Sequence, residues 1–231
     1  MPKKKKAVKA ATPKKAKAAK PRGTKPAMPK PAKAQKSKKA LKPEPEQKEQ
    51  LLVSEVVFEG RLFKVLRDKL IEPCGKTSER DVIRHHGSVV ILAIDSSKNK
   101  KNPWIVIERQ YRHAAKQFLW ELPAGKLEPG EDALEGAKRE LKEETGYSAK
   151  KWKPLVEYYP SPGFLGESMK VFLAEGLQAG EAHPEDDEQI EFRLVKLSDV
   201  LKMIDKGAIL DGKTLSGVLL YARRLRGKHG K

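Results

Sequence analysis

Residues 51–225 carry short apolar runs separated by polar turns. The clearest run is residues 88–94, whose continuous apolar character is typical of a strand buried on both faces. Glu59 and Gly60 form a turn between the apolar runs at residues 53–58 and 61–71, which predicts an N-terminal antiparallel hairpin. Residues 81–84 are expected to form a short extended segment. The predicted strands besides residues 88–94 are residues 53–58, 61–71, 104–108, 152–159, 168–174 and 191–197.

Three segments predict helices. Residues 132–145 carry an apolar stripe at the spacing of one helix face, formed by Ala133, Leu134, Ala137 and Leu141. Gly146 is typical of the residue just past a helix end. Ser198 is a good N-cap for a second helix through residue 206, and residues 215–225 predict a third. Strands and helices in this order predict an α/β fold, in which a mixed β-sheet lies between helices.

Three carboxylates of the first predicted helix fall on one face. Glu140, Glu143 and Glu144 are spaced i, i+3 and i+4, so their charges repel one another on a bare helix. A divalent cation would relieve that repulsion, and oxygen ligands suit magnesium, which also binds substrate phosphates. The alternative is a solvated helix whose acids pair with neighbouring Lys and Arg side chains. The pattern therefore leaves metal-assisted phosphate chemistry and an ordinary surface helix open.

The charge of the chain is concentrated at its N-terminus. Residues 1–50 hold 17 Lys, one Arg and three Glu, a net charge of +15 out of +18 for the whole chain. Residues 1–43 contain no aromatic residue and no acid, so they bury too little apolar surface to offset the entropy of ordering. We therefore expect a disordered basic tail at residues 1–48 and one folded domain at residues 49–231.

The composition of the tail resembles the Lys-Ala-Pro tails of linker histones and bacterial histone-like proteins. That resemblance implies loose, sequence-independent binding of nucleic acid or another polyanion, and the alternative is a solubilising extension. The single cysteine, Cys74, allows neither an intrachain disulfide nor a cysteine zinc site, and no apolar run reaches the roughly 18 residues of a membrane span. We expect a cytoplasmic protein, associated with the nucleoid where the tail binds nucleic acid.

The spacing around the acidic helix carries a family resemblance. From Gly125 the chain reads Gly, five residues, Glu131, seven residues, Arg-Glu-Leu, one residue, Glu-Glu, one residue, Gly-Tyr147. This segment resembles the Nudix box, and the resemblance implies the Nudix fold and magnesium-dependent hydrolysis of a diphosphate. Pro162 lies sixteen residues after Gly146, which resembles the ADP-ribose pyrophosphatases of that family. The products would be AMP and ribose 5-phosphate.

Two other functions stay open at this point. GDP-mannose pyrophosphatases and other enzymes acting on nucleoside diphosphate sugars are close relatives of the ADP-ribose enzymes. The Nudix domain could also be the binding module of a nucleic-acid-associated protein, although retention of all three helix carboxylates favours an enzyme. The family further implies a homodimer, because the N-terminal strands of its members cross to the partner.

The resemblance also implies the metal site. Glu140 and Glu144 would be the principal side-chain ligands of Mg²⁺, or of Mn²⁺ as the alternative ion. Glu143 would assist them, and the carbonyl group of Ala124 would add an oxygen. Arg139 would hold Glu131 and Glu143 in place rather than touch the substrate.

The remaining implied site residues act on the substrate. Glu167 would orient or deprotonate the attacking water, and its alternative is a solvated loop acid. Arg84 and Arg112 would contact the diphosphate or the terminal ribose, since the planar fork of arginine meets phosphate with two hydrogen bonds. For Arg84 the alternative is an ion pair with a carboxylate of the protein.

Overall fold

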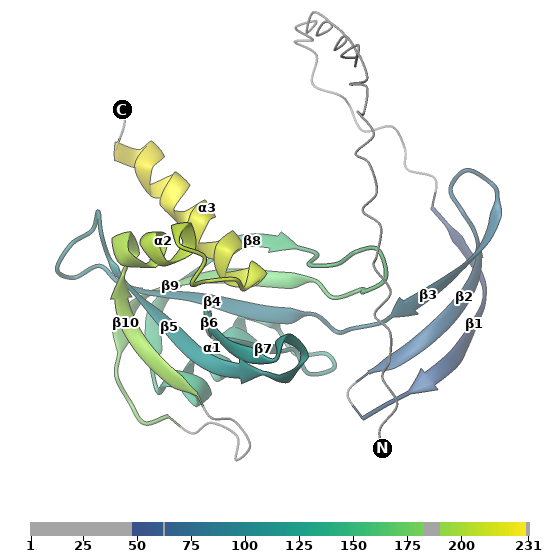
Figure 1. Cartoon of the computed structure of the whole chain (residues 1–231), viewed down its shortest axis with the longest axis horizontal. Helices are drawn as coiled ribbons and strands as arrows, with labels where there is room; N and C mark the ends of the chain where they lie inside the picture. Colours follow the sequence, from purple (N-terminus) through teal and green to yellow (C-terminus); the bar gives the residue numbers. More distant parts are fainter. Residues whose placement is uncertain (1–47, 62, 183–189, 230–231) are drawn as a thin grey trace, which may run out of the picture. The chain divides into compact units, whose positions relative to one another are not determined.

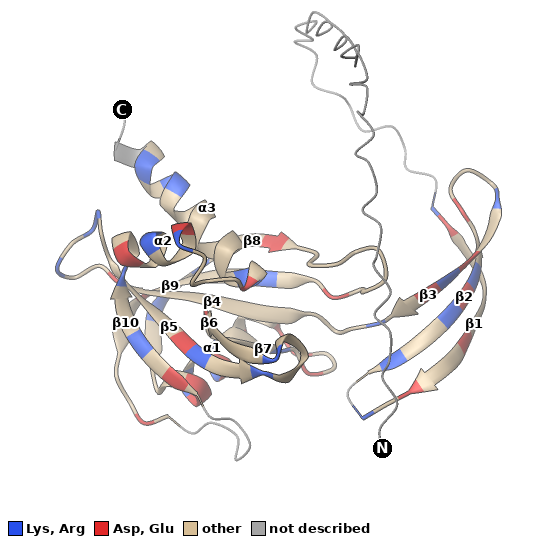
Figure 2. Ribbon diagram, in the orientation of Figure 1, with Lys and Arg blue, Asp and Glu red and all other residues tan. Residues whose placement is uncertain are grey.

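The protein is described here by a computed structural model, in which residues 48–61, 63–182 and 190–229 are described (Figure 1). The compact unit Pro45–Lys231 holds every described element. The predicted basic tail lies outside the described residues except for Lys48. Over the described part of the chain, acidic and basic residues are interspersed along the ribbon (Figure 2). No helix in that part is long and apolar enough to cross a membrane.

The N-terminal strands form a three-stranded antiparallel sheet. Its strands are β1 (Gln50–Glu59), β2 (Lys64–Ile71) and β3 (Thr77–Ile83), in the order β1-β2-β3. The predicted hairpin is present as β1 and β2, but the prediction lacked the third strand of the sheet, β3. The short extended segment expected at residues 81–84 is the end of β3, which pairs along its whole length with β2 from Ile71↔Thr77 to Val65↔Ile83.

The second sheet has seven strands and is mixed. Its main order is β10-β5-β4-β9-β8, with β6 paired to β5 and β7 paired to β4. The pair β4–β9 is parallel and its other pairs are antiparallel. The strands are β4 (Ser88–Asp95), β5 (Trp104–Arg112), β6 (Gln117–Glu121), β7 (Ala124–Lys126), β8 (Ser148–Tyr158), β9 (Met169–Gln178) and β10 (Glu191–Lys196).

Helices cover both faces of this sheet, as the sequence predicts (Figure 1). The odd positions Val89, Ile91 and Ala93 of β4 pack with Ala137 and Leu141 of α1 (Ala133–Thr145). The even positions of β4 face the opposite cluster, which includes side chains of α2 (Leu197–Asp205) and α3 (Gly212–His229). Because successive strand residues point to opposite faces, a strand covered on both sides must be apolar throughout.

Local capping residues fix the ends of α1. The Asp132 side chain accepts hydrogen bonds from the backbone N–H groups of Leu134 and Glu135, which satisfies donors that the first helical turn leaves unpaired. At the other end Gly146 adopts φ +71°, a conformation that a side chain disfavours. The predicted helix therefore begins and ends within a residue of its expected bounds.

The predicted N-cap of α2 is wrong. The helix begins two residues earlier, at Leu197 with Lys196 as its cap residue, and the Lys196 side chain makes no capping hydrogen bond. Instead the Ser198 N–H donates to Asn102 Oδ1 at 2.8 Å, and Asn102 Nδ2 donates to Ser198 Oγ at 3.0 Å. An amide from the β4–β5 loop thus does the capping.

The seven-stranded sheet splits at its centre. β4 and β5 pair only at Ile94↔Ile105 and Asp95↔Trp104, after which β4 pairs with β7 and β5 with β6. Glu108 and Glu121 lie directly opposite one another on β5 and β6, and both are buried. Three charged side chains of the candidate site, Glu108, Arg112 and Glu121, lie on the strands that separate here.

Candidate active site

Glu140 lies over the backbone of Gly125. A Cβ atom added to Gly125 would stand 1.9 Å from Glu140 Cδ, so the carboxylate occupies the space that any side chain at position 125 would need. The position therefore requires glycine for a close approach, not for an unusual φ. It brings an acid of α1 against the short strand β7.

Glu144 reaches the same strand one turn later. It is buried, and its Oε2 accepts a hydrogen bond from the Ala124 N–H at 3.2 Å. Glu140 and Glu144 therefore converge on the consecutive residues Ala124 and Gly125. The helix face predicted from the sequence thus presents two acids to one short stretch of backbone.

Arg139 joins the acids of the box. It donates to Glu131 through Nε at 3.0 Å and Nη2 at 3.2 Å, and through Nη1 to Glu140 at 2.8 Å and Glu143 at 3.0 Å. Its Nη2 also donates to the Lys126 carbonyl oxygen. These bonds, led by those to Glu131, raise the pKa of Arg139, and the same contact lowers the pKa of the Glu131 carboxyl.

Glu108 is a site residue that the sequence did not indicate. Its carboxylate is fully buried on β5, and neither oxygen has a hydrogen-bond partner among the residues that the structure describes. Burial, with a smaller contribution from nearby Glu121, raises its pKa to about 8 against the lowering effect of Lys213. Glu144 lies close by, but two ionised carboxylates cannot bond, so that contact needs a proton on one of them.

These side chains fit a magnesium or manganese site by their chemistry. Glu140 and Glu144 offer carboxylate oxygens beside the Ala124 peptide, and Glu108 adds buried oxygens that receive no hydrogen bond from the described part of the chain. Within the described ranges, no three His, Cys, Asp or Glu side chains already form a metal-binding group. Arg139 bonds both Glu140 and Glu143, so a hard cation would have to draw Glu140 away from that arginine.

Glu167 is held at the start of β4. Ser88 Oγ donates to Glu167 Oε1 at 2.5 Å, and Ser88 pairs with Lys126 of β7 on one side and Met169 of β9 on the other. The nearby His85 Nδ1 lies 3.9 Å from the same oxygen and accepts a hydrogen bond from the Gly87 N–H. Glu167 therefore lies at the N-terminal end of β4, beside β7, the strand that contains Gly125.

The two predicted arginines differ in their surroundings. Arg112, on β5, donates from Nε and Nη2 to both oxygens of Glu121 at 2.9 and 2.7 Å. Arg84 donates to Asp68 Oδ2 of β2 at 2.6 Å, and its side chain is 56% exposed. Arg112 thus belongs to the charged group beside the box, whereas the described partner of Arg84 belongs to the three-stranded sheet.

Sequence reasoning missed Glu108, Glu121 and Lys213. A charge after the apolar run Trp104–Ile107 predicts the end of a strand, yet β5 continues to Arg112. Glu121 and Lys213 are 92 positions apart, so no local spacing relates them. A signal for Glu108 was available only in the alternation of β5, in which Gln110 and Arg112 follow Glu108 on one face.

Comparison with known proteins gives the class of the molecule. Residues 84–216 match the NUDIX domain, more than half of the chain, and the chain therefore belongs to the Nudix family. It is 38% identical over 169 residues to the ADP-ribose pyrophosphatase of Bacillus subtilis (strain 168), which covers 72% of this chain and 88% of that protein.

Two further comparisons bear on substrate and fold. The chain is 30% identical over 193 residues to the GDP-mannose pyrophosphatase of Cronobacter sakazakii, covering 76% of this chain and 95% of that protein. A crystal structure of an ADP compounds hydrolase matches with a TM-score of 0.67 at 21% identity, over 80% of this chain and 98% of that chain. The expected Nudix fold is thereby confirmed.

Proposed function

We propose that this protein hydrolyses the diphosphate of ADP-ribose to AMP and ribose 5-phosphate with magnesium. The observation that carries the proposal is the convergence of Glu140 and Glu144 on Ala124 and Gly125, with Arg139 bonded to Glu131, Glu140 and Glu143. Similarity to the B. subtilis ADP-ribose pyrophosphatase over most of both chains supports the substrate.

The residues divide the work as follows. Glu140, Glu144 and the Ala124 carbonyl group would hold Mg²⁺, or Mn²⁺ in its place, with Glu143 assisting. The bound ion would neutralise diphosphate oxygens and lower the pKa of an attacking water. Arg139 lowers the pKa of the Glu131 carboxyl and holds Glu140 and Glu143 in position by hydrogen bonds, and it contacts no substrate in this scheme.

We assign proton transfer to Glu167 and substrate binding to Arg112 and Arg84. Glu167 accepts the proton of the attacking water, with Ser88 bonded to one oxygen of its carboxylate. Arg112 donates to the diphosphate from the guanidinium N–H groups that Glu121 does not use. Arg84 contacts the diphosphate or ribose only after it exchanges its bond to Asp68.

A substrate panel tests the function. Purified protein with Mg²⁺ is given ADP-ribose, GDP-mannose and other nucleoside diphosphate sugars, and nucleoside monophosphate release is measured. We expect the highest kcat/KM with ADP-ribose, and Glu144→Gln to remove most of that turnover without lowering Tm. Preference for GDP-mannose would favour the alternative function, hydrolysis of nucleoside diphosphate sugars, which the similarity to the Cronobacter sakazakii protein supports. Absence of all turnover by the folded protein would favour a nucleic-acid-associated binding module.

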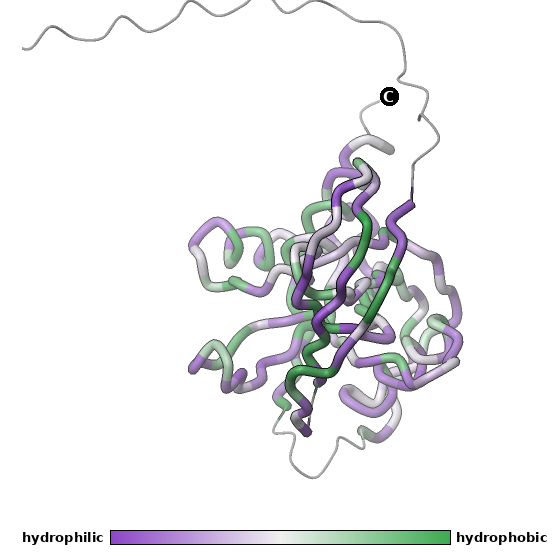
Figure 3. The backbone as a smooth tube through the Cα atoms, turned by 90° about the vertical axis from the view of Figure 1, so that its right-hand side faces the viewer, coloured by the Kyte–Doolittle hydropathy of each residue, from purple (hydrophilic) through white to green (hydrophobic). Residues whose placement is uncertain are grey.

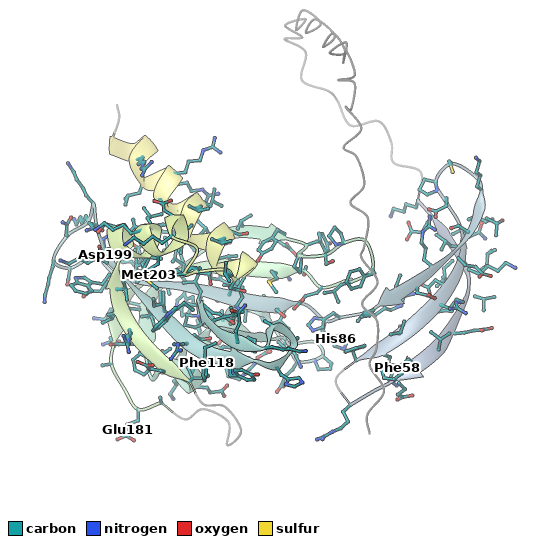
Figure 4. All side chains as sticks on the ribbon, in the orientation of Figure 1. Phe58, His86, Phe118, Glu181, Asp199 and Met203 are labelled. Carbon is teal, nitrogen blue, oxygen red and sulfur yellow. The ribbon has the colours of Figure 1, made fainter. Side chains whose placement is uncertain are left out.

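We also propose a homodimer formed through β1. All ten residues of β1 are exposed, and six large apolar side chains are between 44% and 54% exposed: Leu51, Leu52, Val53, Val56, Val57 and Phe58. In Figure 3 the tube leaving the grey trace turns green along this strand, and Figure 4 shows Phe58 on it. An exposed apolar patch of this size marks an interaction surface, and a second copy would cover it.

Sedimentation of the full chain tests this dimer. Phe58→Glu places a charge at the patch and is expected to shift the protein toward monomer, whereas Lys98→Gln on the β4–β5 loop, which changes the net charge by the same one unit, leaves the mass unchanged. A monomeric parent protein at micromolar concentration would contradict the proposal.

The tail and the location of the protein complete the proposal. A nucleotide substrate and a single, exposed cysteine suit the reducing cytoplasm. The 17 basic residues of residues 1–43 suit nonspecific contact with nucleic acid, and hence association with the nucleoid.

A further inference from the structure

A buried chain of ion pairs links the last helix to Arg112. Glu121 lies at its centre with a side chain only 1% exposed, and Arg112 holds both of its oxygens. From the other side Lys213 Nζ, in the first turn of α3, donates to Glu121 Oε2. One carboxylate therefore bonds an arginine of the site and a lysine of a helix that the proposed reaction does not otherwise use.

Lys213 is itself held in place. Its Nζ lies 3.2 Å from Asp211 Oδ1, and Asp211 Oδ2 accepts from the N–H and the hydroxyl group of Thr214 at 2.9 and 2.6 Å. The Leu122 N–H donates to Thr214 Oγ1 at 2.8 Å. The start of α3 is thus bonded to the residue that follows Glu121, which fixes the lysine relative to the carboxylate.

The charge balance around Glu121 requires this lysine. Glu108 lies directly opposite Glu121 on the neighbouring strand, and both side chains are buried, so a negative charge on one disfavours a negative charge on the other. Burial would raise the pKa of Glu121, but its hydrogen bond to Arg112 and its interaction with Lys213 outweigh burial and lower it. Without Lys213, Arg112 alone would face two buried acids.

We propose that Lys213 is a positioning residue for substrate binding: through Glu121 it fixes the guanidinium group of Arg112 that meets the diphosphate. The inference rests on the proposed function, because it takes Arg112 as a substrate contact. Glu121 uses Nε and Nη2 of Arg112, which leaves Nη1 to a phosphate oxygen in a direction that the carboxylate sets. Loss of Lys213 would let the carboxylate and the guanidinium turn together.

The test is Lys213→Met, which keeps an unbranched stem and removes the charge. We expect the KM for ADP-ribose to rise about tenfold, because a charge-assisted contact to the substrate is misaligned, while kcat changes by less than about twofold. Lys202→Met is the matched control, since Lys202 is an exposed lysine that pairs with Asp199 on α2. That control is expected to leave KM unchanged.

A double-mutant cycle separates positioning from a general structural role. Arg112→Ala is expected to raise KM by itself, and adding Lys213→Met to it should change KM by less than about twofold, because the residue through which Lys213 acts is absent. An equal rise in both backgrounds overturns the inference and leaves the proposed function standing. An unchanged KM in Arg112→Ala overturns both the role of Arg112 and the inference.

A second variant covers the case in which Lys213→Met does not fold. Glu121→Gln breaks the same chain at its next link and preserves side-chain volume. Its KM must also rise in the parent background and not in the Arg112→Ala background. Tm is measured for every variant, so that a loss of folded protein is not counted as a loss of binding.

Discussion

At the scale of single residues, the site depends on a missing side chain. The Glu140 carboxylate fills the place where Gly125 would carry a Cβ atom. Gly125→Ala should therefore displace the carboxylate while the backbone stays, since the clash involves the far end of a flexible side chain. We expect Mg²⁺ affinity, measured by titration, to fall about tenfold with little change in Tm.

Gly227→Ala is the control for that variant. Gly227 lies in α3, and an added Cβ would meet no atom within 4 Å. It should leave Mg²⁺ affinity unchanged. Equal Mg²⁺ affinity for Gly125→Ala and the parent protein would remove Glu140 from the metal site.

Glu167 gives a second prediction at this scale. A group that acts only in the transition state lowers kcat and kcat/KM together when it is removed, and general bases contribute about 10²–10⁴-fold. We expect Glu167→Gln to lower kcat within that range with KM nearly unchanged, in steady-state assays with ADP-ribose. Glu157→Gln, an exposed acid of β8, is the control. A rise in KM alone would make Glu167 a binding residue.

At the scale of elements, the sequence predicted those strands and helices whose formation depends on residues within the same segment. The core strand β4 and the box helix α1 both match the sequence prediction, because an unbroken apolar run and a capped amphipathic stripe are complete within their own segments. The N-cap of α2 could not be predicted, because Asn102 supplies it from a position 96 residues away. The contact between Lys213 and Glu121 could not be predicted for the same reason, because the two residues are 92 positions apart.

The distant cap has a measurable value. Asn102→Ala leaves the first turn of α2 without its side-chain acceptor, and loss of a cap costs about 1 kcal/mol of unfolding free energy. We expect a lower Tm and a lower midpoint in urea, with kcat and KM unchanged. Lys98→Ala, in the same loop and with no capping bond, should keep the parental Tm. A parental Tm for Asn102→Ala would show that backbone and solvent contacts suffice at this helix end.

At the scale of the whole molecule, charge divides the chain. Residues 1–50 carry +15, and residues 51–231 hold 31 basic and 28 acidic residues. Polyanion binding by the tail would release counterions, at about 0.9 in the slope of log affinity against log salt for each phosphate neutralised. We expect the full chain to bind duplex DNA in this salt-dependent way, and a chain beginning at Lys48 to lose that binding and keep full turnover.

Fluorescence anisotropy at 50 and 200 mM salt measures the effect. Six phosphates engaged would weaken binding by about a thousandfold over that range. Equal DNA affinity with and without the tail would refute the polyanion role. A fall in turnover on truncation, without nucleic acid present, would place the tail in the active site.

The parallel pairing of β4 and β9 joins two segments that the ribosome synthesises at different times. Ser88 pairs with Met169 and Ile94 with Glu175, a separation of 81 positions at each. At about 5–20 residues per second, a ribosome needs about 4–16 s to supply the partner of a strand already synthesised. Before β9 is synthesised, the strands that can pair with β4 are β5, at two positions, and β7, at three. The edge of β4 that pairs with β9 therefore cannot gain its parallel partner until that much more of the chain has been synthesised.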